Sequence, residues 1–138
     1  MSSSTEDFNQ QIIDEFRANG GEVGGMFEGA PLLLLDHRGA KSGQERVAPL
    51  VYLADDGRYV VFASKAGAPT NPGWYHNLLA HPDVTIEVGS ETMRALAEEV
   101  KGDERDRLFA EQAGRMENFA EYERKTTRVI PVIVLTPA

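Results

Sequence analysis

The first periodic pattern along the chain is helical and covers Glu6–Asn19. Apolar residues recur there every three or four positions, which places them near one face of an amphipathic helix. They are Phe8, Ile12, Ile13 and Phe16. We expect Ser4 or Thr5 to cap this helix and Gly20 to end it. Half of the residues in Gly20–Gly29 are glycine, so this segment is predicted to be a mobile link.

Shorter apolar segments bounded by turn residues follow, and they predict six strands. The expected strands are Leu32–His37, Arg46–Ala54, Arg58–Ser64, Asp83–Val88, Thr92–Val100 and Val129–Leu135. Asp55-Asp56-Gly57 is typical of a hairpin turn, and Gly89-Ser90-Glu91 joins a second pair of strands. Pro131, inside the last strand, indicates a sheet edge or a bulge.

Three further helices are expected among these strands. They are predicted over Trp74–Ala80, from an Asp103 cap to about Ala113, and over Glu117–Arg124. Strands joined by hairpins favour a mostly antiparallel barrel or curved sheet with helices packed at its ends. A doubly wound sheet would require regular alternation of strand and helix, which this order lacks. The predicted fold class is therefore mostly β with flanking helices.

Composition narrows the classes of protein to consider. At 138 residues the chain is long enough for one domain with one core. It contains no cysteine, which excludes disulfides, zinc–cysteine sites and thiol nucleophiles and is typical of a reducing cytoplasm. The longest apolar run, Ala30–Leu35, is far below the roughly 18 residues of a membrane span. Met1–Ser4 lacks the basic start and apolar stretch of a secretory signal, so we expect a cytoplasmic protein.

The formal net charge is −8, and a generally acidic protein repels nucleic acid, so no nucleic-acid partner is expected. Charge is unevenly spread, however. The segment Arg38–Lys65 holds five basic residues against three acidic ones. Such a basic segment is suited to one compact anionic ligand.

Two common kinds of catalytic site are not favoured. The three histidines, His37, His76 and His81, have neither the spacing of a zinc site nor a cysteine beside them. Neither Ser42 nor Ser64 lies in a Gly-x-Ser-x-Gly nucleophile elbow. We therefore expect no metal site and no serine triad.

The stretch from Arg38 to Arg46 is the first candidate for ligand binding. Gly39 and Gly43 permit a tight turn whose amide N–H groups point at an anion. Lys41 and Arg46 flank that turn, and the arginine fork suits a phosphate or a carboxylate. The alternative is a polar hairpin with solvated charges, because Gly-x-Lys-Ser-Gly is not a Walker A sequence.

The second candidate combines small residues with aromatic ones. Gly67, after Ala63-Ser64-Lys65-Ala66, lets a flat ligand approach the backbone closely. Trp74 and Tyr75, at the start of a helix, offer aromatic area. The alternatives are that Trp74 is a core anchor and that Asn71 and Asn77 are caps or hold a loop in place.

Taken together, these motifs carry a family resemblance that spans Gly24 to Pro137. They are Gly39-x-Lys41-Ser42-Gly43-x-x-Arg46-x-x-Pro49-Leu50, Ala63-Ser64-Lys65-x-Gly67, Asn71-Pro72-x-Trp74-Tyr75-x-Asn77-Leu78 and Arg128-x-Ile130-Pro131. In order and spacing they resemble the deazaflavin-dependent nitroreductase family. These are actinobacterial flavin/deazaflavin oxidoreductases that use coenzyme F420, an 8-hydroxy-5-deazaflavin with a phosphate and a polyglutamate tail.

The resemblance implies a split β-barrel related to the FMN-binding proteins, formed by a single deazaflavin-binding domain over residues 1–138. It also implies two groups of cofactor-binding residues. The phosphate side of the cofactor would be held by Ala40, Lys41, Ser42, Arg46, Val47, Ala48 and Pro49. The ring system would be surrounded by Ala63, Ser64, Lys65, Gly73, Trp74, Tyr75, His76 and Asn77.

The chain also departs from the family pattern. Ala40 stands where the family commonly has arginine, although Arg38 is close enough to compensate. Relatives that reduce nitroimidazoles carry several tyrosines at positions that hold other residues here; those positions are Val51, Met116 and Phe119. Tyr122 is kept. The departures concern the acceptor more than the cofactor.

The implied activity is hydride transfer from C5 of reduced deazaflavin to an electron-poor acceptor, such as a quinone, an activated alkene in an enone-like lactone, or a nitroaromatic. The cofactor carries the difficult chemistry, so no catalytic dyad is required of the protein. Tyr122 and Ser64 are the expected proton donors or hydrogen-bond anchors for the acceptor. Their alternative roles are a helix-surface aromatic residue and a strand-end hydroxyl.

Two rival functions share this fold. One is an FMN-dependent oxidoreductase, and the other is a carrier that binds the deazaflavin without turnover. The partner we expect is a small-molecule acceptor, with the chain as a monomer or homodimer. The first helix would cover the barrel or the acceptor pocket; a peripheral contact with the plasma membrane is the alternative, disfavoured because its acidic face would be repelled by anionic lipid.

Overall fold

The computed structural model describes residues 4–24, 31–63, 72–126 and 129–138. Their strands form one seven-stranded sheet in which every pairing is antiparallel, with the order β2-β1-β5-β6-β7-β4-β3. The strands are β1 (Leu32–Arg38), β2 (Glu45–Val51), β3 (Leu53–Asp55), β4 (Arg58–Phe62), β5 (Asp83–Val88), β6 (Glu91–Val100) and β7 (Val132–Pro137). The helices are α1 (Ser4–Ala18), α2 (Gly73–Ala80), α3 (Gly102–Arg115) and α4 (Glu117–Lys125).

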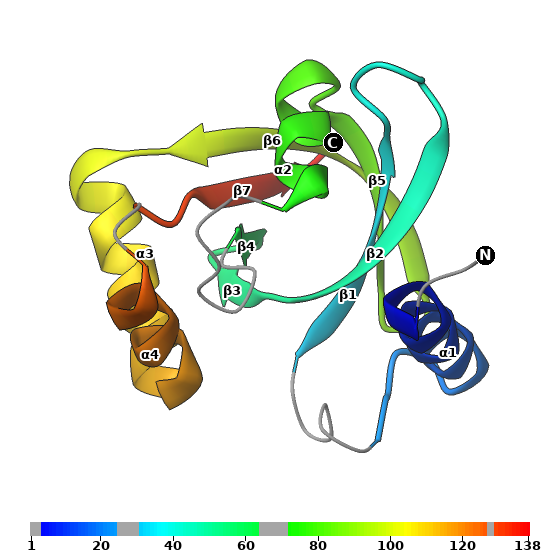
Figure 1. The fold of residues 1–138 in the computed structure, drawn as a ribbon, viewed down its shortest axis with the longest axis horizontal. Helices are drawn as coiled ribbons and strands as arrows, with labels where there is room; N and C mark the ends of the chain where they lie inside the picture. Colours follow the sequence, from blue (N-terminus) through cyan, green and yellow to red (C-terminus); the bar gives the residue numbers. More distant parts are fainter. Residues whose placement is uncertain (1–3, 25–30, 64–71, 127–128) are drawn as a thin grey trace.

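Two strands that follow each other in sequence lie at opposite edges of this sheet. Only Tyr52 separates β2 from β3, and its N–H donates to the Pro31 carbonyl at 3.0 Å. The sheet therefore curls into a half-barrel, with β2 running directly into β3 (Figure 1). The predicted class, mostly β with flanking helices, is confirmed. The single strand expected over Arg46–Ala54 is wrong, because the chain changes edges at Tyr52.

The alternation of side chains along the strands divides the core into layers. One cluster holds alternate strand residues together with Leu78 of α2, and Trp74 and Tyr75 pack against it. Its strand members are Leu33, Leu35, Val61, Val84, Ile86, Ala95, Ile133 and Leu135, and Ala63, directly after β4, packs with them. A second cluster, containing Phe62, Val132 and Val134, packs against α3 and α4. Helix α2 thus covers one face of the curled sheet, and α3 and α4 cover the other at one end (Figure 1).

The predicted first helix is confirmed, and its apolar side packs on the sheet. Ile12, Ile13 and Phe16 are buried with Leu32 and Leu34 of β1. The side chain of Phe8, the fourth expected member, lies outside the described residues. After α1 the backbone approaches the β5–β6 turn so closely that a Cβ on Gly21 would lie 2.6 Å from the Gly89 Cα. None of the described helices is long and apolar enough to cross a membrane.

Two local predictions, for Pro131 and Asp103, are wrong, and a third lies largely outside the described residues. Pro131 does not lie at an edge or bulge, since β7 begins one residue later and lies between β6 and β4. Its carbonyl instead accepts a hydrogen bond from the Ala63 N–H at 3.0 Å. Asp103 is not a cap, because α3 begins at Gly102 and places Asp103 in its first turn. The link predicted over Gly20–Gly29 lies largely outside the described residues.

Candidate functional site

The turn between β1 and β2 is tighter than the sequence suggested. The N–H of Gly39 donates to the Gln44 carbonyl at 2.9 Å, and that of Gly43 donates to the Gly39 carbonyl at 2.9 Å. The Gln44 N–H donates to Ser42 Oγ at 3.2 Å. Gly43 adopts a φ of 69°, which favours glycine. Most amides of this turn are bonded, and among the described residues the N–H groups of residues 41 and 42 have no partner that would compete with an anion.

A side chain on α2 holds this turn in place. The Ala40 N–H donates to Asn77 Oδ1 at 2.9 Å. On its other side, the Asn77 amide nitrogen lies 3.0 Å from Nδ1 of His37. His37 is buried, and burial together with the positive charge of Arg46 lowers its pKa to about 4. A neutral His37 accepts from Asn77 through Nδ1. Asn77 therefore holds a loop in place, which was one of the roles expected for it beside those of a cap and a ring-binding residue.

The four predicted residues of β2 face two different ways. Arg46 pairs with His37 in the β1–β2 register, and Ala48 pairs with Leu35. Val47 and Pro49 point to the opposite face by alternation, and Val47 packs against the α1 cluster there. A ligand on the α2 side of the sheet therefore meets Arg46 and Ala48, and the other two support the strand from behind.

The predicted ring-binding residues gather where β4 ends and α2 begins. Ala63 is fully buried, and Trp74 and Tyr75 are half-buried against the same cluster. Gly73 and His76 are exposed, and the His76 ring lies edge-on to Tyr75 at a centroid distance of 5.4 Å. Several residues singled out from the sequence lie outside the described residues; they are Ser64, Lys65, Ala66, Gly67, Asn71 and Arg128.

Tyr75 has a fixed hydrogen-bond partner that the sequence did not indicate. Its hydroxyl donates to Glu99 Oε1 of β6 at 2.6 Å. Burial, with the hydrogen bond to Glu99 and the negative charge of that residue, raises the pKa of Tyr75 to about 12. The phenol is therefore neutral and held in one orientation across the physiological pH range.

The residues expected around the acceptor do come together. Val51, Met116 and Tyr122 pack against the second core cluster, which contains Phe119. The rings of Phe119 and Tyr122 lie 5.4 Å apart in an edge-on arrangement. Tyr122, on α4, is half-buried against the second cluster, so it is more than a surface aromatic residue. Trp74 and Tyr75 pack in the other cluster, on the face of the sheet that α2 covers, so the described residues do not bring the expected ring and acceptor positions together.

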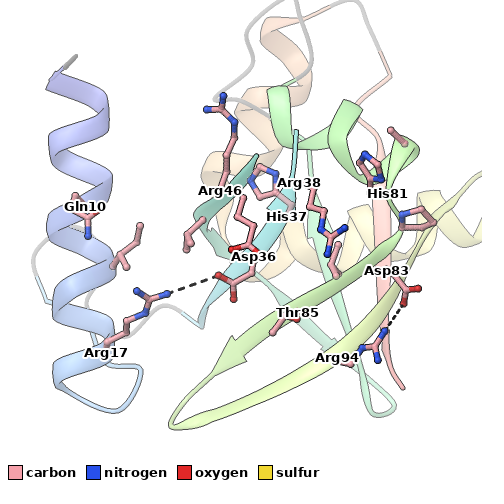
Figure 2. A pocket seen from close by; sticks show the side chains of 16 residues that line it. Gln10, Arg17, Asp36, His37, Arg38, Arg46, His81, Asp83, Thr85 and Arg94 are labelled. Atoms are coloured by element: carbon pink, nitrogen blue, oxygen red, sulfur yellow. Dashed lines mark ion pairs between the residues drawn. The ribbon is translucent and has the colours of Figure 1, made fainter. Parts of the chain in front are cut away.

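An open cavity of about 1040 Å³ lies between α1, β1, β5 and the segment after α2 (Figure 2). Of the predicted site residues, Arg46 and Val47 line it. It is rich in charged side chains, which are Arg17, Asp36, Arg38, Glu45, Arg46, Asp83 and Arg94. Arg17 pairs with Glu87 at 2.8 Å and Arg94 with Asp83 at 3.7 Å. Within the described residues, Arg38 and Arg46 have no ion pair and are exposed, so they remain available to an anion.

Two carboxyl groups at the base of α1 share one arginine. Arg17 binds Glu87 through two hydrogen bonds, from Nε at 3.0 Å and from Nη2 at 2.8 Å. The same guanidinium is 4.0 Å from Asp36. Burial, followed by the hydrogen bond to Glu87 and the negative charge of that residue, raises the pKa of Asp36 to about 7. The pKa of Glu87 is lowered, chiefly by its hydrogen bond to Arg17. The proton of this pair therefore resides on Asp36.

Sequence reasoning missed this cluster because Arg17 and Glu87 are 70 positions apart. The sequence did offer one signal for it. Asp36 in β1 and Glu87 in β5 are acidic residues within largely apolar strands. The described residues contain no group of three or more histidine or acidic side chains placed to hold a metal ion.

Comparison with known proteins gives a consistent result. A family model described as F420H(2)-dependent quinone reductase matches residues 9–137. The F420H(2)-dependent quinone reductase Rv1261c of Mycobacterium tuberculosis (strain H37Rv) is 41% identical over 125 residues, covering 88% of this chain and 84% of its own. A solved F420-H2 dependent reductase (FDR-A) superposes with a TM-score of 0.70 at 37% identity, over 76% of this chain and 93% of that one.

A second solved structure, described as a domain-swapped dimer, is similar over nearly the whole chain. It has a TM-score of 0.73 and 33% identity, and the match covers 96% of this chain and 99% of that one. More distant structures share the fold alone, such as the haem storage protein HutZ of Vibrio cholerae at 19% identity and a TM-score of 0.61.

Proposed function

The chain belongs to the family of F420H(2)-dependent quinone reductases, and on that premise we propose that it transfers hydride from reduced coenzyme F420 to a quinone-type acceptor. The observation that carries this proposal is the family match, which extends over residues 9–137 and thus includes the whole sheet. The relatives are named as reductases, which favours an enzyme over a carrier without turnover.

The residues of the site fit the cofactor chemically. Its phosphate and carboxylates require cations that are not neutralised within the protein, and Lys41, Arg38 and Arg46 are exposed basic residues in and beside the β1–β2 turn. A flat ring requires a small residue beside aromatic area, which fully buried Ala63 and half-buried Trp74 and Tyr75 supply. The same donor set favours F420 over FMN, because the polyglutamate tail adds negative charge that FMN lacks.

When bound, reduced F420 supplies the hydride from C5. The protein's own residues bind and orient the two reactants. Lys41 and Arg46 would hold the phosphate side, and Trp74 and Tyr75 would lie beside the ring. Tyr75 is fixed by Glu99 and stays neutral, so no phenolate charge arises next to the ring at neutral pH. Tyr122 and Ser64 are the proposed hydrogen-bond donors to the oxygen of the acceptor.

We also propose that the working form is a homodimer. The support is the relative solved as a domain-swapped dimer, which is 33% identical and aligned over 96% of this chain. Light scattering coupled to size-exclusion chromatography at micromolar concentration tests this, and a monomer at every concentration would contradict it.

The cofactor site is tested by titrating oxidised F420 into the wild type, Lys41→Ala and Arg46→Ala at low and high salt. Each side chain supplies a charge-assisted hydrogen bond of about 1.5–3 kcal/mol, so each variant should raise Kd by about one to two orders of magnitude. Binding by the wild type should weaken with salt, and the double variant should lose most of that dependence. Lys125→Ala, at the far end of α4, is the matched control and should bind like the wild type. Unchanged affinity in both variants would show that the turn is a solvated hairpin.

Turnover is tested by following the absorbance of reduced F420 before and after addition of menadione. The proposal predicts oxidation of F420 only when the quinone and the protein are both present. Tight binding of F420 without oxidation would indicate a carrier instead. Binding of FMN in preference to F420 would indicate the flavin-dependent alternative.

A further inference from the structure

We propose that His37 and Asn77 act together as positioning residues, in which His37 orients the Asn77 amide and Asn77 holds the β1–β2 turn in its anion-binding shape. The inference rests on the proposed function, since that turn is where the phosphate side of F420 would bind. It assigns a role to a buried histidine that the proposed chemistry leaves unused.

The contacts run from the sheet through α2 to the turn. Asn77 lies half-buried near the middle of α2, and its side chain is directed between β1 and the turn. Its Oδ1 accepts from the Ala40 N–H at 2.9 Å, a contact between residues 37 positions apart. Its amide nitrogen lies 3.0 Å from His37 Nδ1. The Asn77 side-chain amide therefore connects His37, the last buried residue of β1, to the β1–β2 turn that follows it.

His37 and the Ala40 N–H together favour one orientation of this amide. An asparagine side chain has a donor end and an acceptor end, and rotating it by half a turn exchanges them. The Ala40 N–H can only donate, so it holds Oδ1 toward the turn and leaves the amide nitrogen toward His37. A neutral ring protonated at Nε2 offers Nδ1 as the acceptor that matches this orientation. The reversed amide would face two N–H donors toward each other at Ala40 and leave a buried acceptor unbonded on His37, which is costly.

The environment of His37 keeps the ring in this neutral form. The imidazole is 6% exposed, and the charged group acting on it is Arg46, its partner in the β1–β2 register. Both burial and the positive charge disfavour a second proton on the ring. The orientation of Asn77 is therefore constant across the pH range in which the enzyme would work.

The consequence is that one helix positions both halves of the cofactor site. Helix α2 carries Trp74 and Tyr75 at its start and, through Asn77, fixes the turn that contains Lys41 and Ser42. The turn is tight, since a Cβ on Gly39 would lie 2.5 Å from Ser42 Oγ. A turn held in one shape before binding loses less conformational entropy when the ligand arrives, which increases affinity.

The test is a double-mutant cycle on F420 affinity, with Asn77→Ala, His37→Leu and the double variant. Leucine continues the apolar run of β1 at a similar volume, and alanine is favourable in a helix. Loss of one or two hydrogen bonds predicts a rise in Kd of about fivefold to tenfold for Asn77→Ala and about twofold to fivefold for His37→Leu. Because His37 acts through Asn77, the double variant should bind no more weakly than Asn77→Ala alone. Gln112→Leu, which removes a buried polar side chain on α3, is the matched control and should leave Kd unchanged.

A second measurement needs no cofactor. Hydrogen exchange of the Ala40 amide should be faster in Asn77→Ala and in His37→Leu than in the wild type, with exchange in β5 and β6 unchanged. The ¹⁵N shifts of the His37 ring should show an unprotonated Nδ1 and a protonated Nε2 in the wild type. Asn77→Ala leaves the buried histidine in place, so it keeps the test valid should His37→Leu fail to fold.

Three results would overturn the inference. The first is a Kd of the double variant raised by the product of the two single effects. The second is an F420 affinity of both single variants equal to that of the wild type. The third is an Ala40 amide that exchanges at the wild-type rate in both variants. Failure of the wild type to bind F420 would overturn the proposed function, and this inference with it, whereas wild-type binding with unaffected variants would overturn the inference alone.

Discussion

Replacing Asp36 by asparagine should stabilise this protein at neutral and alkaline pH, although it removes a charged group beside an arginine. The structure explains the sign. Arg17 is committed to Glu87 by two hydrogen bonds, whereas its distance to Asp36 is 4.0 Å. Burial, followed by the hydrogen bond to Glu87 of β5 and the negative charges of Glu87 and of Glu45 from β2, raises the pKa of Asp36 to about 7. An ionised Asp36 is therefore destabilising in the folded state.

The size of the effect follows from proton linkage. The folded state binds a proton at Asp36 more tightly than the unfolded state does, so this contribution to stability is fully present below about pH 4 and is lost as the pH rises through about 7. A rise in pKa from 3.8 to about 7 corresponds to roughly 4 kcal/mol at 1.36 kcal/mol per pH unit. The Asp36 side chain is 31% exposed, so screening by solvent reduces the expected gain for Asp36→Asn to about 1–2 kcal/mol above pH 7.

The measurement is urea denaturation of the wild type and Asp36→Asn at about pH 4, 6 and 8. The free energies of unfolding should coincide at the lowest pH and diverge in favour of the variant as the pH rises. Asp83→Asn is the matched control, because Asp83 lines the same cavity but is 74% exposed, and it should change stability by less than about 0.5 kcal/mol throughout. A difference that is independent of pH, or a wild type that is more stable than the variant at pH 8, would refute the reasoning.

Three further predictions follow from the site. Trp74→Ala should lower both F420 affinity and stability, because Trp74 is half-buried against the core and lies beside the proposed ring site. Urea denaturation should show a loss of stability of about 2–3 kcal/mol. Loss of affinity at unchanged stability would contradict its packing role. Tyr75→Phe should lower the free energy of unfolding by about 1 kcal/mol at pH 8, because it removes the hydrogen bond to Glu99. This advantage of the wild type is present below pH 10 and should disappear as the pH rises through about 12, the raised pKa of Tyr75. Urea denaturation in alkaline buffers measures it, and a difference that does not change with pH would contradict the raised pKa. Val51, Met116 and Phe119 offer apolar area without hydroxyls. Oxidation of reduced F420 should therefore be measurable with simple quinones and enones and slow with bicyclic nitroimidazoles. Efficient nitroimidazole reduction would contradict the placement of these residues near the acceptor.

Elements specified by local sequence were predicted correctly. The apolar face of α1 requires only the spacing of Ile12, Ile13 and Phe16. The hairpin between β3 and β4 requires two residues with positive φ, and Asp56 and Gly57 supply them at 51° and 82°. The break at Tyr52 was missed because the apolar pattern continues through it, and only the return of the chain to the other edge of the sheet ends the strand.

In the candidate site, too, the features set by local sequence could be predicted and those set by distant contacts could not. The basic turn could be predicted because Lys41 and Arg46 lie within a few residues of two glycines. The hydrogen bonds that shape it could not, since Asn77 reaches it from 37 residues away and His37 shows no motif. Glu99 was likewise invisible as the partner of Tyr75, because its contact depends on how β6 passes beside α2. Contacts between distant segments are a property of the assembled sheet.

The passage of the chain from one edge of the sheet to the other also bears on how the protein avoids aggregation. An open sheet exposes two edge strands, and unpaired edges are templates for strand addition by other molecules. Here one edge strand, β3, has only three residues. The other, β2, contains Pro49, which lacks an N–H to offer to an incoming strand. Because only Tyr52 separates β2 from β3, the same short stretch of chain supplies both edges of the described sheet. A three-residue strand and a strand with a proline are both poor templates for strand addition.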